Sequence, residues 1–256
     1  MPVFDTSKKL DTHNLAGKGN FSFSAIKPGD LGAAEYTLVT VGIDVTGSVA
    51  PFADELLVTL KKVIEACKKS PRKDNLLVRV ITFDEEVHEL HGFMLLEDIE
   101  PSNYPKLHPG GCTALFDATG SSIDATLQYG EQLVGNDYDV NAIVIMVTDG
   151  ADNASRSRTP ADIANSVKSA RQSEKLESVL TIVVGLHDPS VTGDSWADEV
   201  KNALETFVRE AHIDQFVDAG DATPQKLAKL ADFVSQSVSS QSQALGTGGP
   251  SQPLTF

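Results

Sequence analysis

The chain has 256 residues, enough for one large domain, and carries 36 acidic against 21 basic residues, a formal net charge of −15. This balance disfavours a nucleic-acid binder and adhesion to anionic lipid, because both need a basic face. Two cysteines are too few for a disulfide scaffold, and no apolar run approaches the ~20 residues that span a bilayer. The first residues show no signal-peptide pattern, so we expect a cytoplasmic protein that contacts neither nucleic acid nor membrane.

Alternating strand and helix patterns follow an N-terminal arm. Residues 1–35 are polar and rich in glycine, with a weak edge strand at 20–26. Apolar and β-branched runs predict strands at 36–44, 76–83, 86–96, 141–148, 179–185 and 215–219. Helical spacing of apolar residues predicts helices at 51–69, 113–133, 160–175, 196–211 and 224–238.

This alternation predicts a doubly wound α/β fold, with a mostly parallel central sheet and helices on both faces. The connection before 86–96 is short, which favours an antiparallel strand at an edge. We therefore expect three parts: an arm (1–35), one α/β domain (36–238) and a flexible tail (239–256). The tail contains no charged residue and few apolar ones, so it is expected not to fold.

Oxygen-bearing side chains follow three segments at the predicted carboxyl edge of the sheet, where ligands bind in such folds. Asp44, Thr46 and Ser48 follow the first buried strand, Thr113 follows a Gly-Gly loop, and Asp149 follows the strand at 141–148. Both carboxylates are expected to point to solvent. Oxygen ligands without sulfur or imidazole favour the hard cations Mg²⁺, Mn²⁺ or Ca²⁺.

These three motifs resemble the von Willebrand factor A (VWA) family. The Asp-x-Thr-x-Ser loop at 44–48, the Gly-Gly-x-Thr loop at 110–113 and Thr-Asp-Gly at 148–150 match its metal-ion-dependent adhesion site (MIDAS) in order and spacing. The resemblance covers residues 36–238 and is greatest to stand-alone intracellular bacterial members. One departure is Thr46, where the family usually has serine; its hydroxyl is an equivalent donor.

The resemblance implies that Thr46, Ser48 and Thr113 offer hydroxyls to the cation, and that Asp44 and Asp149 lie close by. Neutral donors leave the cation its positive charge, which then attracts a carboxylate of a protein partner. The family further suggests a MoxR-type AAA+ ATPase assembly as the partner. On this interpretation the chain is a binding module and not an enzyme.

A haloacid-dehalogenase-like phosphotransferase is the alternative. Asp44 would be its nucleophile, and Asp149 would hold Mg²⁺. Such chemistry needs a cation upstream of the magnesium motif to neutralise the phosphoryl group. The sequence has no Lys or Arg between Lys106 and Arg156, which disfavours this alternative.

One further pair of residues invites a zinc interpretation. His88 and His91 lie near glutamates, but their spacing on a strand places the rings on opposite faces. We expect both to be solvated surface residues.

Overall fold

The computed structural model describes residues 10–15, 19–172, 176–188, 194–247 and 253–256. Within them, eight strands form one sheet in the order β1-β2-β5-β4-β3-β6-β7-β8. The strands are β1 (Asp11–Asn14), β2 (Ser22–Ala25), β3 (Glu35–Asp44), β4 (Leu76–Phe83), β5 (Val87–Leu95), β6 (Asp139–Thr148), β7 (Ser178–His187) and β8 (Gln215–Asp221). The α-helices are α1 (Ala53–Cys67), α2 (Leu115–Val134), α3 (Pro160–Gln172), α4 (Asp194–Glu210) and α5 (Pro224–Thr247).

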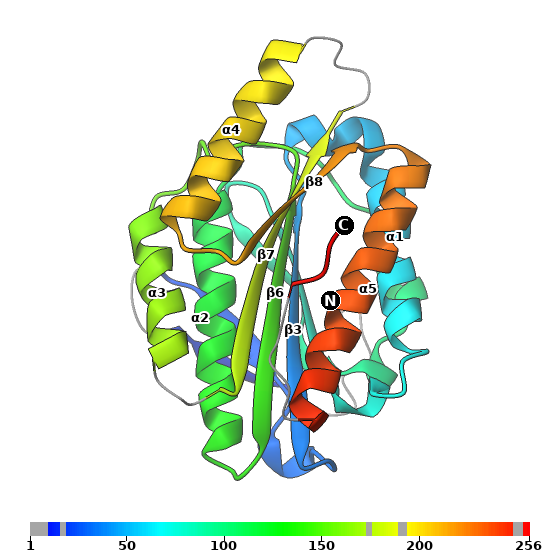
Figure 1. Ribbon diagram of the computed structural model, residues 1–256, viewed down its shortest axis with the longest axis vertical. Helices are drawn as coiled ribbons and strands as arrows, with labels where there is room; N and C mark the ends of the chain where they lie inside the picture. Colours follow the sequence, from blue (N-terminus) through cyan, green and yellow to red (C-terminus); the bar gives the residue numbers. More distant parts are fainter. Residues whose placement is uncertain (1–9, 16–18, 173–175, 189–193, 248–252) are drawn as a thin grey trace.

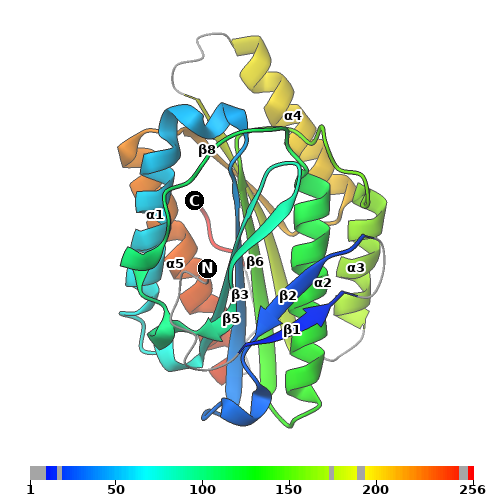
Figure 2. The same cartoon turned by 180° about the vertical axis from the view of Figure 1, so that it is seen from behind.

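The sheet is covered on both faces (Figures 1 and 2). Helices α1 and α5 lie together on one face, while α2, α3 and α4 cover the other. Strands β3, β4, β6, β7 and β8 are parallel to one another, whereas β5 runs antiparallel to β4. The predicted doubly wound α/β fold is therefore confirmed, including its antiparallel strand.

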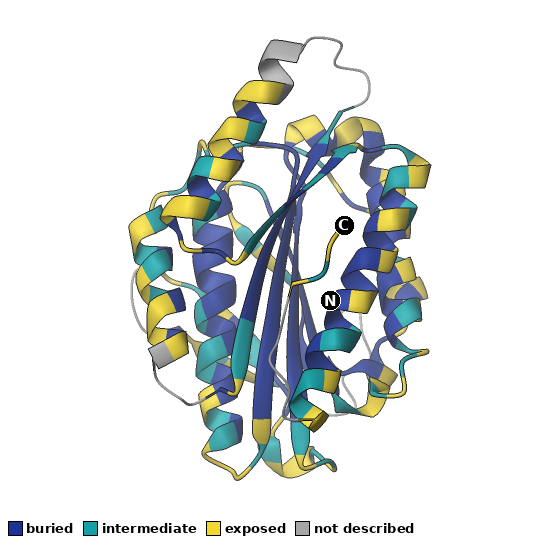
Figure 3. Ribbon diagram, viewed as in Figure 1, coloured by how far each residue is buried: buried dark blue, intermediate teal, exposed yellow. Residues whose placement is uncertain are grey.

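The central strand β3 is buried on both faces, as its continuous apolar run predicts. Val39, Val41 and Ile43 pack into the core beneath α1 and α5, whereas Leu38 packs into a second core on the α2 side. In Figure 3 most of the length of this strand and its neighbours is coloured as buried. β3 thus gives its carboxyl end, at Asp44, a rigid support.

The N-terminal arm extends the sheet beyond β5. β2 pairs with β5 at Ala25 and Phe93, and β1 pairs antiparallel with β2. Glu89 on β5 links β2 to β4. Its carboxylate accepts hydrogen bonds from the Ser24 backbone N–H at 3.0 Å and from Arg79 Nε at 2.7 Å. Arg79 is a buried cation on β4. The strand predicted at 20–26 is confirmed as β2, but it lies between β1 and β5, so β1 and not β2 forms the edge.

The prediction of a flexible tail from Ser239 is corrected by helix α5, which continues to Thr247. Gln241 lies against the sheet and is buried; its Nε2 donates to the Ala142 carbonyl and to Ser178 Oγ, both at 3.0 Å. Its own carbonyl accepts from Asn141 Nδ2 at 2.6 Å. These polar contacts hold a helix end that has too few apolar residues to be recognised from the sequence. The division into arm, domain and tail as separate units stays a prediction.

His91 also differs from the prediction of a solvated pair. His88 is exposed, but His91 is buried, with Nε2 2.8 Å from the Tyr104 hydroxyl and Nδ1 3.0 Å from the Gly92 carbonyl oxygen. The register between β4 and β5 shifts near Val80. Such irregularities and the loop that carries Tyr104 cannot be read from residue spacing. Burial lowers the pKa of His91 to about 4.

No helix among the described residues combines the length and apolar character that crossing a bilayer requires.

We predict that Gln241→Ala lowers the free energy of unfolding by about 1–3 kcal/mol, because buried hydrogen-bonding groups lose their partner. Gln243→Ala, an exposed position two residues later, is the matched control and should change stability by less than about 0.5 kcal/mol. Urea unfolding followed by circular dichroism measures both. Equal stability of the two variants would show that the end of α5 contributes nothing to the fold.

We also predict that His91 makes the protein sensitive to acid. An unfolded histidine titrates near pH 6.5 and folded His91 near 4, so between these values the unfolded state binds the extra proton. The free energy of unfolding should therefore fall as pH drops from about 6.5 to 4, by up to about 3 kcal/mol from this residue. Urea unfolding across this range should show a shallower slope for His91→Gln and an unchanged slope for the exposed control His88→Gln.

Candidate functional site

Three loops meet at the carboxyl edge of the sheet. The loop after β3 and the segment before α2 are joined by backbone hydrogen bonds, from Gly110 N to the Val45 carbonyl at 2.9 Å and from Gly47 N to the Gly111 carbonyl at 3.4 Å. Gly111 has φ = +73°, a conformation that side-chain-bearing residues rarely adopt. The glycine pair thus lets the 110–113 segment lie directly against the loop after β3.

Asp44 is the innermost residue of the site. Its side chain is buried, and both oxygens accept hydrogen bonds, Oδ1 from Thr46 N at 2.8 Å and Oδ2 from Thr148 Oγ1 at 2.6 Å. Thr148 ends β6, the strand next to β3. Asp44 therefore ties together the two central strands and orients the loop that carries Thr46 and Ser48.

Ser48 connects the first loop to Asp149. Its hydroxyl donates to Asp149 Oδ1 at 2.8 Å and lies 3.1 Å from Thr46 Oγ1. Asp149 is 2% exposed, and its other oxygen, Oδ2, is buried with no hydrogen-bond partner. Both carboxylates are thus buried, which corrects the expectation that they point to solvent. The loops close over the strand ends, and strand patterns do not reveal this.

Thr113 is held from the far side of the site by Asn153. Thr113 N donates to Asn153 Oδ1 at 2.8 Å, and Asn153 N returns a bond to the Thr113 carbonyl at 2.9 Å. A Cβ added to Gly150 would lie 3.3 Å from Thr113 Oγ1, so the glycine leaves room for the hydroxyl. The structure therefore brings the loops that carry all five predicted site residues to one place.

These loops surround a hollow of about 370 Å³, lined by Thr46, Gly47, Ser48, Gly111, Cys112, Thr113, Gly150, Ala151, Asp152, Asn153 and Val200. Thr148 and Asn153 were not predicted as site residues. Thr148 lies within the Thr-Asp-Gly motif. The motif indicated that Thr148 lies near the site, but it did not indicate the hydrogen bond to Asp44. The sequence did not indicate the role of Asn153, because this role depends on a hydrogen bond to Thr113, which lies 40 residues away in the chain.

The site disfavours the ionised forms of its two carboxylates. Burial raises the pKa of Asp149 to about 7, with a further contribution from the charge of Asp44 and opposition from the Ser48 hydrogen bond. Burial also raises the pKa of Asp44, while hydrogen bonds from Thr148 and Thr46 lower it. Neither carboxylate forms an ion pair with any described Lys, Arg or His side chain. The fold therefore buries two adjacent acids without a protein counter-charge.

Further acidic residues surround these two. A Cβ added to Gly111 would lie 3.6 Å from Glu85 Oε1 and 3.7 Å from Asp84 Cβ, which places both residues beside the hollow. Asp152 lines the hollow itself. The negative charge of Asp188 contributes to the raised pKa of Asp149. We call Asp84, Glu85, Asp152 and Asp188 the acidic rim.

The donor set fits a hard divalent cation. It combines two buried carboxylates, one with an unpartnered oxygen, and three hydroxyls around a hollow. Among the described residues no group of three or more His, Cys, Asp and Glu side chains is arranged to hold a metal. A cation here would thus depend on the hydroxyls of Thr46, Ser48 and Thr113.

Comparison with known proteins gives the fold. No family model and no curated protein matches the sequence. Among solved structures, the PilB minor pilin from Streptococcus sanguinis is similar, with 11% identity, a TM-score of 0.56 and coverage of 86% of this chain and 64% of that one. Pilus adhesin SpaC from Lactobacillus rhamnosus GG gives 10% identity and a TM-score of 0.52 over 82% of this chain and 31% of that one.

Proximal thread matrix protein 1 from the mussel byssus, solved with a zinc-occupied MIDAS motif, gives 19% identity and a TM-score of 0.50. The match covers 80% of this chain and 46% of that one. Our chain thus spans less than two thirds of each of these three structures. At such identities the likeness shows a VWA-like fold.

We predict that Asp149→Asn stabilises the metal-free protein at pH 8. Wild-type Asp149 must ionise there in a buried site, and its pKa, raised from 3.8 to about 7, sets an upper limit of about 4 kcal/mol on the gain. The wild type binds this proton more tightly when folded, so its stability falls as pH rises from about 4 to 7. Urea unfolding in EDTA should show the difference at pH 8 and little at pH 4; equal stability at both would contradict it.

Proposed function

We propose that the chain is a protein-binding module that captures a carboxylate of its partner through a divalent cation held by Asp44, Thr46, Ser48, Thr113 and Asp149. When bound, the cation supplies a positive centre that accepts an anionic oxygen. The observation that carries the proposal is the pair of adjacent buried carboxylates with no protein counter-charge. Burying such charges is costly unless a cation compensates them.

The protein's own groups prepare the site. Thr148 and the Thr46 N–H hold Asp44 in one orientation, and Ser48 holds one oxygen of Asp149 while leaving the other available. The three hydroxyls are neutral, and Asp44, both of whose oxygens accept hydrogen bonds from the protein, would act on the cation through water. These direct donors would leave much of a divalent charge uncompensated. The hollow beside Thr46, Ser48 and Thr113 then gives a partner's carboxylate a place to enter.

The phosphotransferase alternative gains no support from this geometry. A nucleophilic Asp44 would need an accessible oxygen, but its side chain is 1% exposed and both oxygens accept hydrogen bonds from the protein. VWA-like folds, moreover, generally serve as non-catalytic binding modules. We therefore propose binding rather than catalysis.

The finer features of the function remain predictions from the resemblance. Mg²⁺ and Mn²⁺ suit a site of carboxylates and hydroxyls, as does Ca²⁺. The cytoplasmic location is a prediction from the sequence, and a MoxR-type AAA+ ATPase as partner is what the family resemblance suggests.

Calorimetric titration of the EDTA-treated protein with Mn²⁺ and with Mg²⁺ tests the proposal. We expect one site in the wild type, and its loss in Asp149→Ala, because that variant removes the carboxylate with the unpartnered oxygen. Glu85→Gln is the matched control, since it removes one negative charge beside the hollow without touching the proposed donors. Wild-type protein that binds neither ion, with or without added acetate, would refute the proposal.

Thr113→Ala should distinguish binding of the cation from binding of the carboxylate that the cation receives. The hydroxyl lies across the hollow from the first loop, so its loss is expected to weaken binding of acetate to the Mn²⁺-loaded protein more than binding of Mn²⁺ itself. Titration of each in turn gives both constants. Equal losses would contradict the proposed role of this residue.

A further inference from the structure

A basic patch lies at the opposite edge of the sheet from the candidate site. Six of the chain's 21 basic residues fall between Lys61 and Lys73, where Glu65 is the only acid. Lys68, Lys69 and Lys73 form no ion pair with any described residue, and we call these three the lysine patch. On a chain of net charge −15, such a concentration of uncompensated positive charge marks a surface for an acidic partner.

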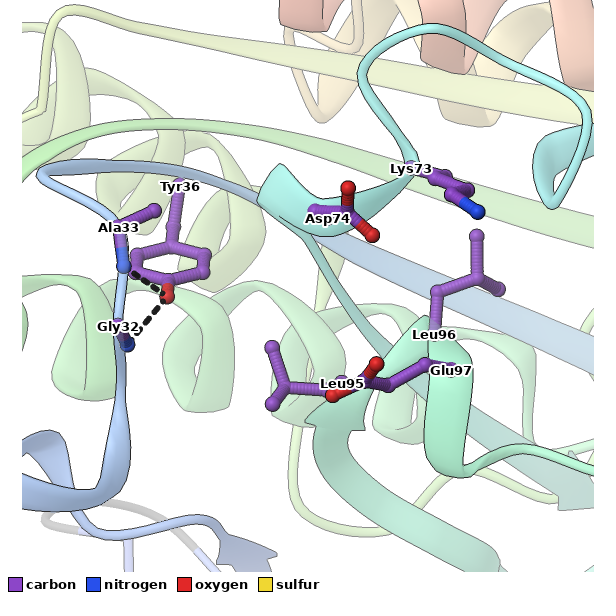
Figure 4. A pocket seen from close by; sticks show the side chains of 8 residues that line it. All are labelled: Gly32, Ala33, Tyr36, Lys73, Asp74, Leu95, Leu96 and Glu97. Carbon is purple, nitrogen blue, oxygen red and sulfur yellow. Dashed lines mark hydrogen bonds between the residues drawn. The ribbon is translucent and has the colours of Figure 1, made fainter.

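An exposed carboxylate, Asp74, lies within this patch. Asp74 follows Lys73 directly, is exposed, and forms neither an ion pair nor a side-chain hydrogen bond with a described residue. It borders a hollow of about 270 Å³ that Tyr36, Lys73, Leu95 and Glu97 also line (Figure 4). Lys68 and Lys73 line the adjoining hollow. Glu97, a second exposed carboxylate, lines both hollows, so the chain presents Asp74 beside Lys68 and Lys73 with one further acid nearby.

This arrangement complements the candidate site. The site offers a hollow for a carboxylate and is surrounded by the acidic rim of Asp84, Glu85, Asp152 and Asp188. A carboxylate flanked by lysines satisfies both demands, because the carboxylate can meet the cation while the lysines meet the rim. Repulsion from the rim would weaken binding of a carboxylate without such neighbours.

The two surfaces of one molecule cannot meet. Asp74 precedes β4, and Asp44 lies beside the last residue of β4, Phe83. Eight residues of extended strand separate the two edges by roughly 25 Å. Any contact between them must therefore join two molecules, and because it uses different surfaces on each, it leaves one of each free for the next copy.

We propose that a second copy of this chain is a partner: Asp74 of one copy enters the cation site of the next, and the lysine patch docks on the acidic rim. Repetition of this contact builds head-to-tail chains. The inference rests on the proposed function, since it needs a cation at the site.

Sedimentation velocity over a range of protein concentrations, in Mn²⁺ and in EDTA, tests this proposal. We expect monomers in EDTA, and in Mn²⁺ species that grow with protein concentration and shrink with added salt. A closed dimer that does not grow further would overturn the proposal, because it implies a self-complementary contact.

Asp74→Asn should weaken Mn²⁺-dependent association by roughly 30-fold or more, while leaving Mn²⁺ binding intact. Asp139→Asn is the matched control, because Asp139 is an exposed aspartate at the start of β6, on the same edge of the sheet. It should associate like the wild type. Loss of association in Asp139→Asn but not in Asp74→Asn would overturn the assignment of Asp74.

Mixing two variants gives the sharpest test. Asp74→Asn keeps a cation site but lacks the incoming carboxylate, whereas Asp149→Ala keeps the carboxylate but lacks the cation site. Each should be monomeric alone, and together in Mn²⁺ they should form a dimer that cannot extend. Failure of the mixture to dimerise while the wild type forms chains would overturn the head-to-tail geometry.

The failures of the two proposals can be told apart. If wild-type protein binds Mn²⁺ calorimetrically but stays monomeric at every concentration, self-association is wrong and the proposed function stands. If it binds no Mn²⁺, the proposed function itself fails. Circular dichroism melts of each variant in EDTA confirm that a loss of association does not reflect unfolding.

Discussion

The candidate site depends on one electrostatic constraint, the burial of Asp44 and Asp149 side by side at the carboxyl edge of the sheet. Desolvation and mutual repulsion both disfavour their ionised forms. The fold offsets part of this cost with hydrogen bonds from Thr148, Thr46 and Ser48. One oxygen of Asp149 remains without a partner, and this residual cost is what a bound cation would relieve.

The sheet supplies the rigidity that this constraint requires. β3 and β6 are neighbours in parallel register, with Ile43 opposite Val147, so the next residues of the two strands, Asp44 and Thr148, reach the edge together. Apolar packing on both faces fixes this register, because a slip of one residue would turn every buried side chain to the other face. The site geometry is thus a consequence of core packing well away from it.

Charge is distributed unevenly over the rest of the molecule. The acidic rim lies at the carboxyl edge, whereas Lys68 and Lys73 lie beside Asp74 at the amino edge. Since parallel strands place all their carboxyl ends at one edge, loops before and after the strands face opposite ends of the molecule. The cation site and the lysine patch therefore lie at opposite ends of the molecule, as the proposed head-to-tail contact requires.

The sequence by itself determined the α/β class, most element positions and the five candidate site residues, because hydrophobic period and motif order are local properties. It did not reveal the burial of Asp44 and Asp149, the bond from Thr148 to Asp44, or the support of Thr113 by Asn153, since each depends on loops from distant segments closing over the strand ends. Gln241 and His91 were misjudged for a related reason. Their environments come from the Ala142 carbonyl and the Tyr104 hydroxyl, polar partners that only the tertiary structure places within hydrogen-bonding distance.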